Sequence, residues 1–313
     1  GLFYNKSLEL NQGGYLTEAP SRLISLLNRA YEICAGKSLP YAEGLSPPTE
    51  PGVPYTLEEA VEDLFLDVES AERILTVWQN KKNLILQGPP GVGKTFAARR
   101  LAFALIGFEI PERLGFVQFH QSYSYEDFIQ GYRPSAVGFE LRNGRFFDFC
   151  RQAAEHPNVK YVFIIDEINR GNLSKIFGEL MLLIEADKRG SGWGMPLAYG
   201  DANERFFVPD NVYLLGLMNT ADRSLAVVDY ALRRRFGFFD LGPQFESEKF
   251  KTHLRGNGIN DALINLIRQR LGDLNREIEE DQANLGRGFC IGHSFFCNEP
   301  DELSTEEEWY RLI

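Results

Sequence analysis

The segment GPPGVGKT at residues 88–95 constrains the fold more than any other part of this chain. It follows the apolar run NLILQ (83–87) and precedes the helical sequence FAARRLAFAL. It therefore fits the phosphate-binding pattern G-x-x-x-x-G-K-[ST] in strand–loop–helix order. A glycine-rich turn that matched the pattern by chance would not be expected to lie between a strand and a helix. We expect phosphate contacts from eight consecutive residues: Gly88, Pro89, Pro90, Gly91, Val92, Gly93, Lys94 and Thr95.

The chemistry of such a loop assigns roles to its last two residues. Glycines let the backbone N–H groups face the phosphates at the positive end of the following helix. Lys94 is then placed to reach the β- and γ-phosphates, and the Thr95 hydroxyl to ligate Mg²⁺.

Two later apolar runs end in polar residues suited to the same reaction. YVFIIDE ends in Asp166, the expected acidic partner of the metal, and Glu167, a candidate general base for the attacking water. The run LLGLM is followed by Asn219, which can orient that water if the two strands are neighbours. Asp222 either caps the next helix or helps to hold the water. The Asp-Glu pair points to hydrolysis rather than to binding alone.

Five short apolar runs predict an α/β fold with a mostly parallel five-stranded sheet flanked by helices. They are residues 83–87, 115–119, 161–166, 212–218 and 236–241. Asn143-Gly144 predicts a two-residue hairpin turn inserted on this core. Residues 189–209 predict a second hairpin or loop.

We expect three regions along the chain. Residues 1–55 combine one helix with a Pro/Gly-rich linker, 56–243 form the nucleotide-binding domain, and 244–313 form a helical domain that can be incomplete at Ile313. The sequence from Thr56 to Asn83 reads as helical, with Thr56 as N-cap and Glu59 three residues later.

Composition excludes several classes of function. No apolar run reaches the roughly 18 residues of a membrane span. The net charge of −11 argues against a broad surface that neutralises nucleic-acid phosphates. Four scattered cysteines favour a reducing cytoplasm over a disulfide framework. Cys290, His293 and Cys297 lack a fourth metal ligand and lie in an apolar stretch, so we expect them to be buried structural residues.

Four segments together resemble the McrB family, the AAA+ motors of modification-dependent DNA restriction systems. They are GPPGVGKT, VQFHQSYSYEDFIQGYRP (117–134), FIIDEINRGNLSK (163–175) and MNTADRSLAVVDYALRRRF (218–236). The resemblance covers about residues 56–300, and MNTADRS is its most family-specific part. It implies a P-loop AAA+ module with an α-helical lid, assembly into a hexameric ring, and GTP rather than ATP as substrate. It also implies an McrC-like nuclease partner, with DNA bound through a domain that we do not find in this chain.

The three arginines at 233–235 fit this resemblance in different ways. Arg233 has Asp229 four residues before it, so a local ion pair is its simplest role. Arg234 and Arg235 have no acidic residue in the preceding turn. In a ring, the resemblance implies that these two reach the nucleotide of the neighbouring subunit, where guanidinium groups stabilise charge on the transferred phosphoryl group.

The base preference does not follow from a motif. The N-K-x-D pattern of small GTPases is absent, and we expect the base near Phe65 and its neighbours before the phosphate loop. Two alternatives stay open: an ATP-using chaperone or remodeller of the MoxR type, and a nucleotide-gated scaffold without turnover.

Overall fold

The computed structural model describes residues 52–62, 64–136, 138–200, 203–222 and 230–297. The expected N-terminal helix, the Arg233–Asp229 pair and the end of the expected helical domain at 244–313 therefore lie wholly or partly outside the described residues. From Val53 onward the described residues belong to one compact unit.

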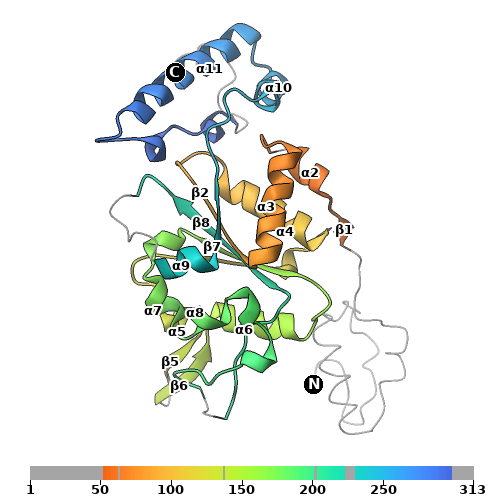
Figure 1. Ribbon diagram of the computed structural model, residues 1–313, viewed down its shortest axis with the longest axis vertical. Helices are drawn as coiled ribbons and strands as arrows, with labels where there is room; N and C mark the ends of the chain where they lie inside the picture. The colour runs from red at the N-terminus through yellow and green to blue at the C-terminus, as the bar shows by residue number, and fades with distance from the viewer. Residues whose placement is uncertain (1–51, 63, 137, 201–202, 223–229, 298–313) are drawn as a thin grey trace, which may run out of the picture. The chain divides into compact units, whose positions relative to one another are not determined.

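A parallel sheet of five strands forms the centre of this unit, in the order β4-β7-β8-β2-β9 (Figure 1). All five predicted strands are confirmed, within two residues at each end. Their bounds are β2 Asn83–Gly88, β4 Leu114–Gln118, β7 Tyr161–Asp166, β8 Val212–Asn219 and β9 Gly237–Asp240.

Helices cover both faces of this sheet, because its strands are apolar on both sides. In β2, Leu84 and Leu86 pack with α3 (Val68–Lys81) and α4 (Lys94–Ile106), while Ile85 faces the opposite cluster. That cluster contains residues of α6 (Arg145–Ala154), α7 (Leu173–Phe177) and α8 (Leu180–Leu183). The predicted fold class is thus confirmed.

The helical sequence after Thr56 is interrupted, contrary to our expectation of continuous helix. Thr56 and Glu59 do form the reciprocal capping box, with N···O distances of 2.7 and 3.2 Å. However, α2 ends at Glu62, and α3 begins at Val68, with Asp67 accepting a hydrogen bond from the Ser70 N–H. The break places Leu64, Phe65 and Leu66 in an irregular segment.

The first inserted hairpin exists, but the predicted turn at Asn143-Gly144 is wrong. Strand β5 (Gln130–Ser135) pairs with β6 (Gly138–Asn143), so the chain turns between Ser135 and Gly138. Gly144 instead precedes α6 and lies against the Phe128 backbone, where an added Cβ would approach the Phe128 carbonyl carbon to 2.3 Å. The glycine is needed for this close approach rather than for a hairpin turn. In the second predicted hairpin or loop, at residues 189–209, Met195 and Phe206 form an antiparallel bridge.

After the sheet, α10 (Glu248–Gly256) and α11 (Asp261–Glu280) form a separate helical layer with its own core. Phe250, Leu254, Leu263 and Ile267 are fully or almost fully buried in it. We call residues 244–297 the lid. The remaining short elements are β1 Val53–Pro54, β3 Phe108–Glu109, α5 Tyr125–Phe128 and α9 Tyr230–Arg235.

Candidate functional site: the carboxyl edge of the sheet

The parallel register brings the predicted polar residues to one edge of the sheet. Gly88 at the end of β2 pairs with Asn219 at the end of β8, and β7 lies on the other side of β8. Parallel strands all end at the same edge, and this edge is where open α/β sheets bind ligands. The phosphate loop and the ends of β7 and β8 therefore share one site.

Two glycines give the phosphate loop its shape. Gly91 and Gly93 have φ values of 75° and 73°, in the left-handed region that side chains with a Cβ disfavour. Gly93 is the N-cap of α4, so Lys94 and Thr95 begin the helix that points at the loop. The glycines of the sequence pattern thus lie where the loop backbone adopts positive φ values, which a side chain would disfavour.

Lys94 turns back onto its own loop. Its ammonium donates to the carbonyl oxygens of Gly88 and Pro89, at 3.0 and 2.9 Å. Burial lowers the pKa of Lys94 from 10.5 to about 8, and the nearby carboxylates of Glu167, Asp166 and Asp222 oppose this shift. A bound anion, such as a phosphate group, would therefore raise the pKa of Lys94 and favour its charged form.

Glu167 and Asn219 meet at the centre of the edge. The Asn219 amide donates to Glu167 Oε1 at 2.6 Å, which requires β7 and β8 to be adjacent. Glu167 has a φ of 51°, a strained conformation for a residue with a side chain, and such strain is common at functional sites. The pair is arranged so that a water held by Asn219 would lie beside a carboxylate.

Sequence reasoning missed two residues that follow Glu167. Arg170 contacts Glu167 Oε2 at 3.2 Å and Asp222 Oδ2 at 3.3 Å, so it bridges two of the predicted residues. Asn169 is buried; its amide nitrogen contacts the Asn219 carbonyl at 3.5 Å, and its amide oxygen has no hydrogen-bond partner among the described residues. The sequence could have indicated both residues, because they follow Asp166 and Glu167 directly in the run DEINR.

The donor set fits a magnesium ion. Asp166 ends β7 beside the phosphate loop, and its Oδ1 accepts a hydrogen bond from the Glu167 N–H at 3.0 Å. Thr95, in the first turn of α4, offers a hydroxyl oxygen. Mg²⁺ prefers such oxygen ligands, with water and phosphate oxygens completing its shell.

A cavity of about 810 Å³ adjoins the phosphate loop between α2, α4 and the lid. Val92, Gly93 and Phe96 line its phosphate end, whereas Phe65, His253 and His293 line the lid side. Burial lowers the pKa of His293 to about 4, and its Nδ1 accepts a hydrogen bond from the Gln244 N–H. Phe65 and the neutral ring of His293 thus offer aromatic surface next to the phosphate site, where a nucleotide base can lie.

Arg234 and Arg235 lie at the opposite edge of the sheet, just before β9. Arg235 is engaged within its own chain: Nη2 contacts Glu185 Oε1 at 2.6 Å, and Nε donates to the Met181 carbonyl at 2.7 Å. Arg234 is exposed, and its guanidinium has no ion pair within the described part of the chain. The geometry separates two arginines that the sequence treated alike.

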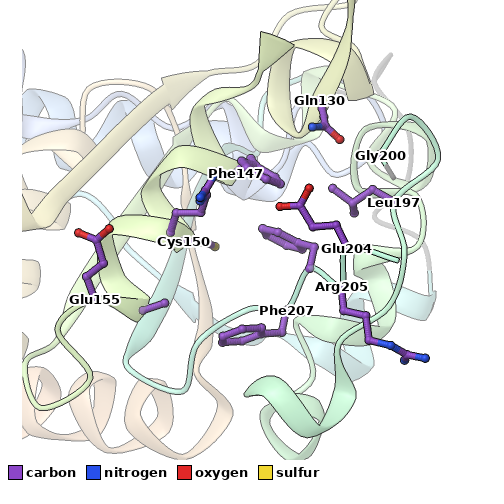
Figure 2. Close-up of a pocket in the computed structure, with 12 residues that line it drawn as sticks. Gln130, Phe147, Cys150, Glu155, Leu197, Gly200, Glu204, Arg205 and Phe207 are labelled. Atoms are coloured by element: carbon purple, nitrogen blue, oxygen red, sulfur yellow. The ribbon is translucent and has the colours of Figure 1, made fainter. Parts of the chain in front are cut away.

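Figure 2 shows a second cavity, of about 320 Å³, between α6 and the segment before β8. Phe147, Cys150 and Leu197 line it, and the Glu204 carboxylate points toward its interior. None of the predicted site residues lines this cavity.

Comparison with known proteins agrees with this geometry. Residues 83–236 match the family described as AAA domain (dynein-related subfamily), and residues 266–313 match the family described as McrB, alpha-helical lid domain. The chain is 51% identical over 315 residues to the "Type IV methyl-directed restriction enzyme EcoKMcrB subunit" of Escherichia coli (strain K12). That alignment covers 99% of this chain and 67% of the relative. The chain belongs to the McrB family.

A more distant relative of this McrB-family chain is the "Type II restriction enzyme BsuMI component YdiS" of Bacillus subtilis (strain 168). It is 24% identical over 256 residues, covering 66% of this chain and 73% of the relative. A solved structure, titled as a putative ATPase from Cytophaga hutchinsonii, matches with a TM-score of 0.37 at 12% identity, over 77% of this chain and 59% of that one.

The chain is thus an AAA+ P-loop nucleoside triphosphatase related to restriction subunits. Among the described helices, none combines the length and the apolar character needed to cross a membrane.

Proposed function

We propose that this chain hydrolyses GTP as the motor subunit of a modification-dependent restriction complex. The observation that carries the proposal is the 2.6 Å contact between Asn219 and Glu167 beside Lys94. A scaffold that only binds nucleotide would not need a carboxylate held toward the place of an attacking water. The resemblance to the McrB family supports guanine as the base.

The residues divide the work as follows. The loop from Gly88 to Thr95 binds the phosphates. Lys94 exchanges its hydrogen bonds to the Gly88 and Pro89 carbonyls for contacts with the phosphates. Thr95 and Asp166 would hold Mg²⁺, which neutralises phosphate charge when bound. Glu167 accepts the proton of the attacking water, and Asn219 orients that water. Asp222 acts through Arg170, which it holds beside Glu167.

Assembly completes the site. We propose a hexameric ring in which Arg234 of one subunit stabilises charge at the γ-phosphate of the next. Arg235, fixed by Glu185, would position the end of α9 that presents Arg234. An McrC-like nuclease subunit would bind this ring and stimulate turnover, and DNA would bind through another part of the assembly.

The test is hydrolysis of GTP and of ATP, each with and without an McrC-like subunit. We expect GTP to be turned over and ATP to compete poorly, with faster GTP turnover when the nuclease subunit is present. Preferential hydrolysis of ATP would instead support a remodeller of the MoxR type. Tight binding with no turnover under any condition would support a scaffold.

A further inference from the structure

A single lysine of the lid holds the segment between α2 and α3. The Lys249 ammonium, from α10, donates to the carbonyl oxygens of Val61, Leu64 and Leu66 at 2.5, 3.2 and 2.9 Å. An ammonium has three protons, so these three acceptors use its full capacity. Lys249 thus links the last turn of α2 and residues 64–66 to the lid.

Phe65 fastens the same segment to the lid a second time. Its ring packs edge-on against Phe250, His253 and His293, with centroid distances of 5.6, 5.8 and 5.0 Å. All three partners belong to the lid, and Phe65 packs against the lid core cluster. Val61, Leu64, Phe65 and Leu66 are therefore attached to the lid by polar or aromatic contacts, although they precede the sheet in the sequence. We call these four residues segment 61–66.

This attachment concerns the nucleotide cavity directly. Leu64, Phe65 and Leu66 line its wall, and Lys249 itself lies at its border. Residues of α4, which begins at the phosphate loop, also line the cavity. The lid contacts of Leu64, Phe65 and Leu66 therefore hold part of the lining of the cavity in place.

We infer that Lys249 is a positioning residue for the base of the bound nucleotide. It holds the wall that contacts the base and leaves the phosphate loop untouched. The inference rests on the proposed function, because it takes this cavity as the place of the base. It gives Lys249 a role in nucleotide affinity and none in the chemical step.

The test compares GTP with a triphosphate ligand that lacks a nucleobase. We expect Lys249→Met to raise KM for GTP about tenfold, which corresponds to about 1.4 kcal/mol, with kcat changed less than twofold. The inhibition constant of magnesium tripolyphosphate, which has no base, should stay within twofold of the unsubstituted protein. Lys249→Arg keeps the cation and its donors, so it should recover most of the GTP affinity.

Lys160→Met is the matched control. Lys160 also donates to a backbone carbonyl, that of Leu105 at 2.9 Å, but it does not line the nucleotide cavity. We expect this variant to keep its KM for GTP. Because Lys249→Met loses three such hydrogen bonds and Lys160→Met one, we expect the first to melt at the lower temperature, and KM is compared at a temperature where both are folded.

Three results would overturn the inference. One is an unchanged KM for GTP in a folded Lys249→Met protein, and another is an equal loss of tripolyphosphate affinity, which would indicate general damage. The third is a fall in affinity that Lys249→Arg does not restore at all. If the unsubstituted protein binds GTP but never hydrolyses it, the proposed function fails, whereas binding affinities still test Lys249. A protein that binds no nucleotide would reject both.

Discussion

The two edges of the central sheet carry polar residues of very different character. At the amino edge, Asn83 and Arg189 are buried and bonded to backbone carbonyls and to each other. Asn211, also buried, donates to three carbonyls. At the carboxyl edge, Glu167 is in a strained conformation and Asn169 has an amide oxygen without a partner among the described residues.

Burial alone does not separate structural polar groups from functional ones. Buried polar groups with all their bonds made stabilise a fold, whereas groups with unused capacity at a ligand-binding edge are available for chemistry. The amino edge should therefore respond to mutation through stability, and the carboxyl edge through turnover.

The largest effect should come from Glu167→Gln. The amide cannot accept a proton, so we expect kcat for nucleotide hydrolysis to fall about 10³-fold while nucleotide still binds. Steady-state hydrolysis and equilibrium binding would measure the two. Glu155→Gln, at an exposed position, is the control. Retained turnover in Glu167→Gln would remove Glu167 as the base.

Arg189→Met probes the amino edge. It removes donors from Asn83 Oδ1 and from the carbonyls of Ile184 and Val212, so the free energy of unfolding should fall by about 3 kcal/mol. Denaturant unfolding would measure it, with Arg205→Met as the control because Arg205 is exposed and donates to the Gly194 carbonyl at 3.0 Å. A stability loss equal to that of the control would contradict the assigned role.

A pair of asparagines tests both edges with the same chemistry. Asn219→Ala should lower kcat about 10²-fold with little change in melting temperature, because it removes the donor that orients the water. Asn211→Ala should do the reverse, lowering stability and sparing kcat, since it leaves three buried carbonyls without a donor. The same outcome for both variants would erase the distinction between the edges.

The two arginines before β9 should also separate. Arg235→Ala removes the contacts to Glu185 and Met181, so the free energy of unfolding should fall by about 1–2 kcal/mol. Arg234→Ala should keep its stability but lose hydrolysis, and mixing it with a Lys94→Ala protein should recover part of that activity. No recovery at any mixing ratio would argue against a role across subunits.

The smallest effect concerns pH. In the protein without nucleotide, the pKa of Lys94 is about 8. Above this pH, Lys94 must take up a proton when the triphosphate binds, so the affinity for the triphosphate should fall up to tenfold per pH unit. The folded pKa lies below the unfolded value, so the cost of burying the charged lysine is present below pH 8 and disappears as pH rises from about 8 toward 10.5. Nucleotide titrations between pH 7 and 9.5 would measure the binding effect; a flat profile would contradict it.

The fold and the residues of the site were predictable to different degrees. The five strands could be located because each is a short apolar run flanked by polar sequence, and the phosphate loop because its glycines are sterically required. The hairpin turn was misplaced because Asn143-Gly144 has a turn signature, while Gly144 is needed for its approach to Phe128. The domain boundaries and the catalytic roles stay predictions.

The parallel α/β core, the phosphate loop and the polar residues that end the strands follow from local pattern and spacing, so they could be predicted from the sequence. Which of these polar residues contact one another depends on the tertiary structure. Arg170 contacts both Glu167 and Asp222. Arg235 pairs with Glu185, which precedes it by 50 residues in the sequence. Lys249 binds segment 61–66 across a separation of 183 to 188 residues. No local pattern encodes such contacts, because they arise only when the sheet and the lid bring distant parts of the chain together.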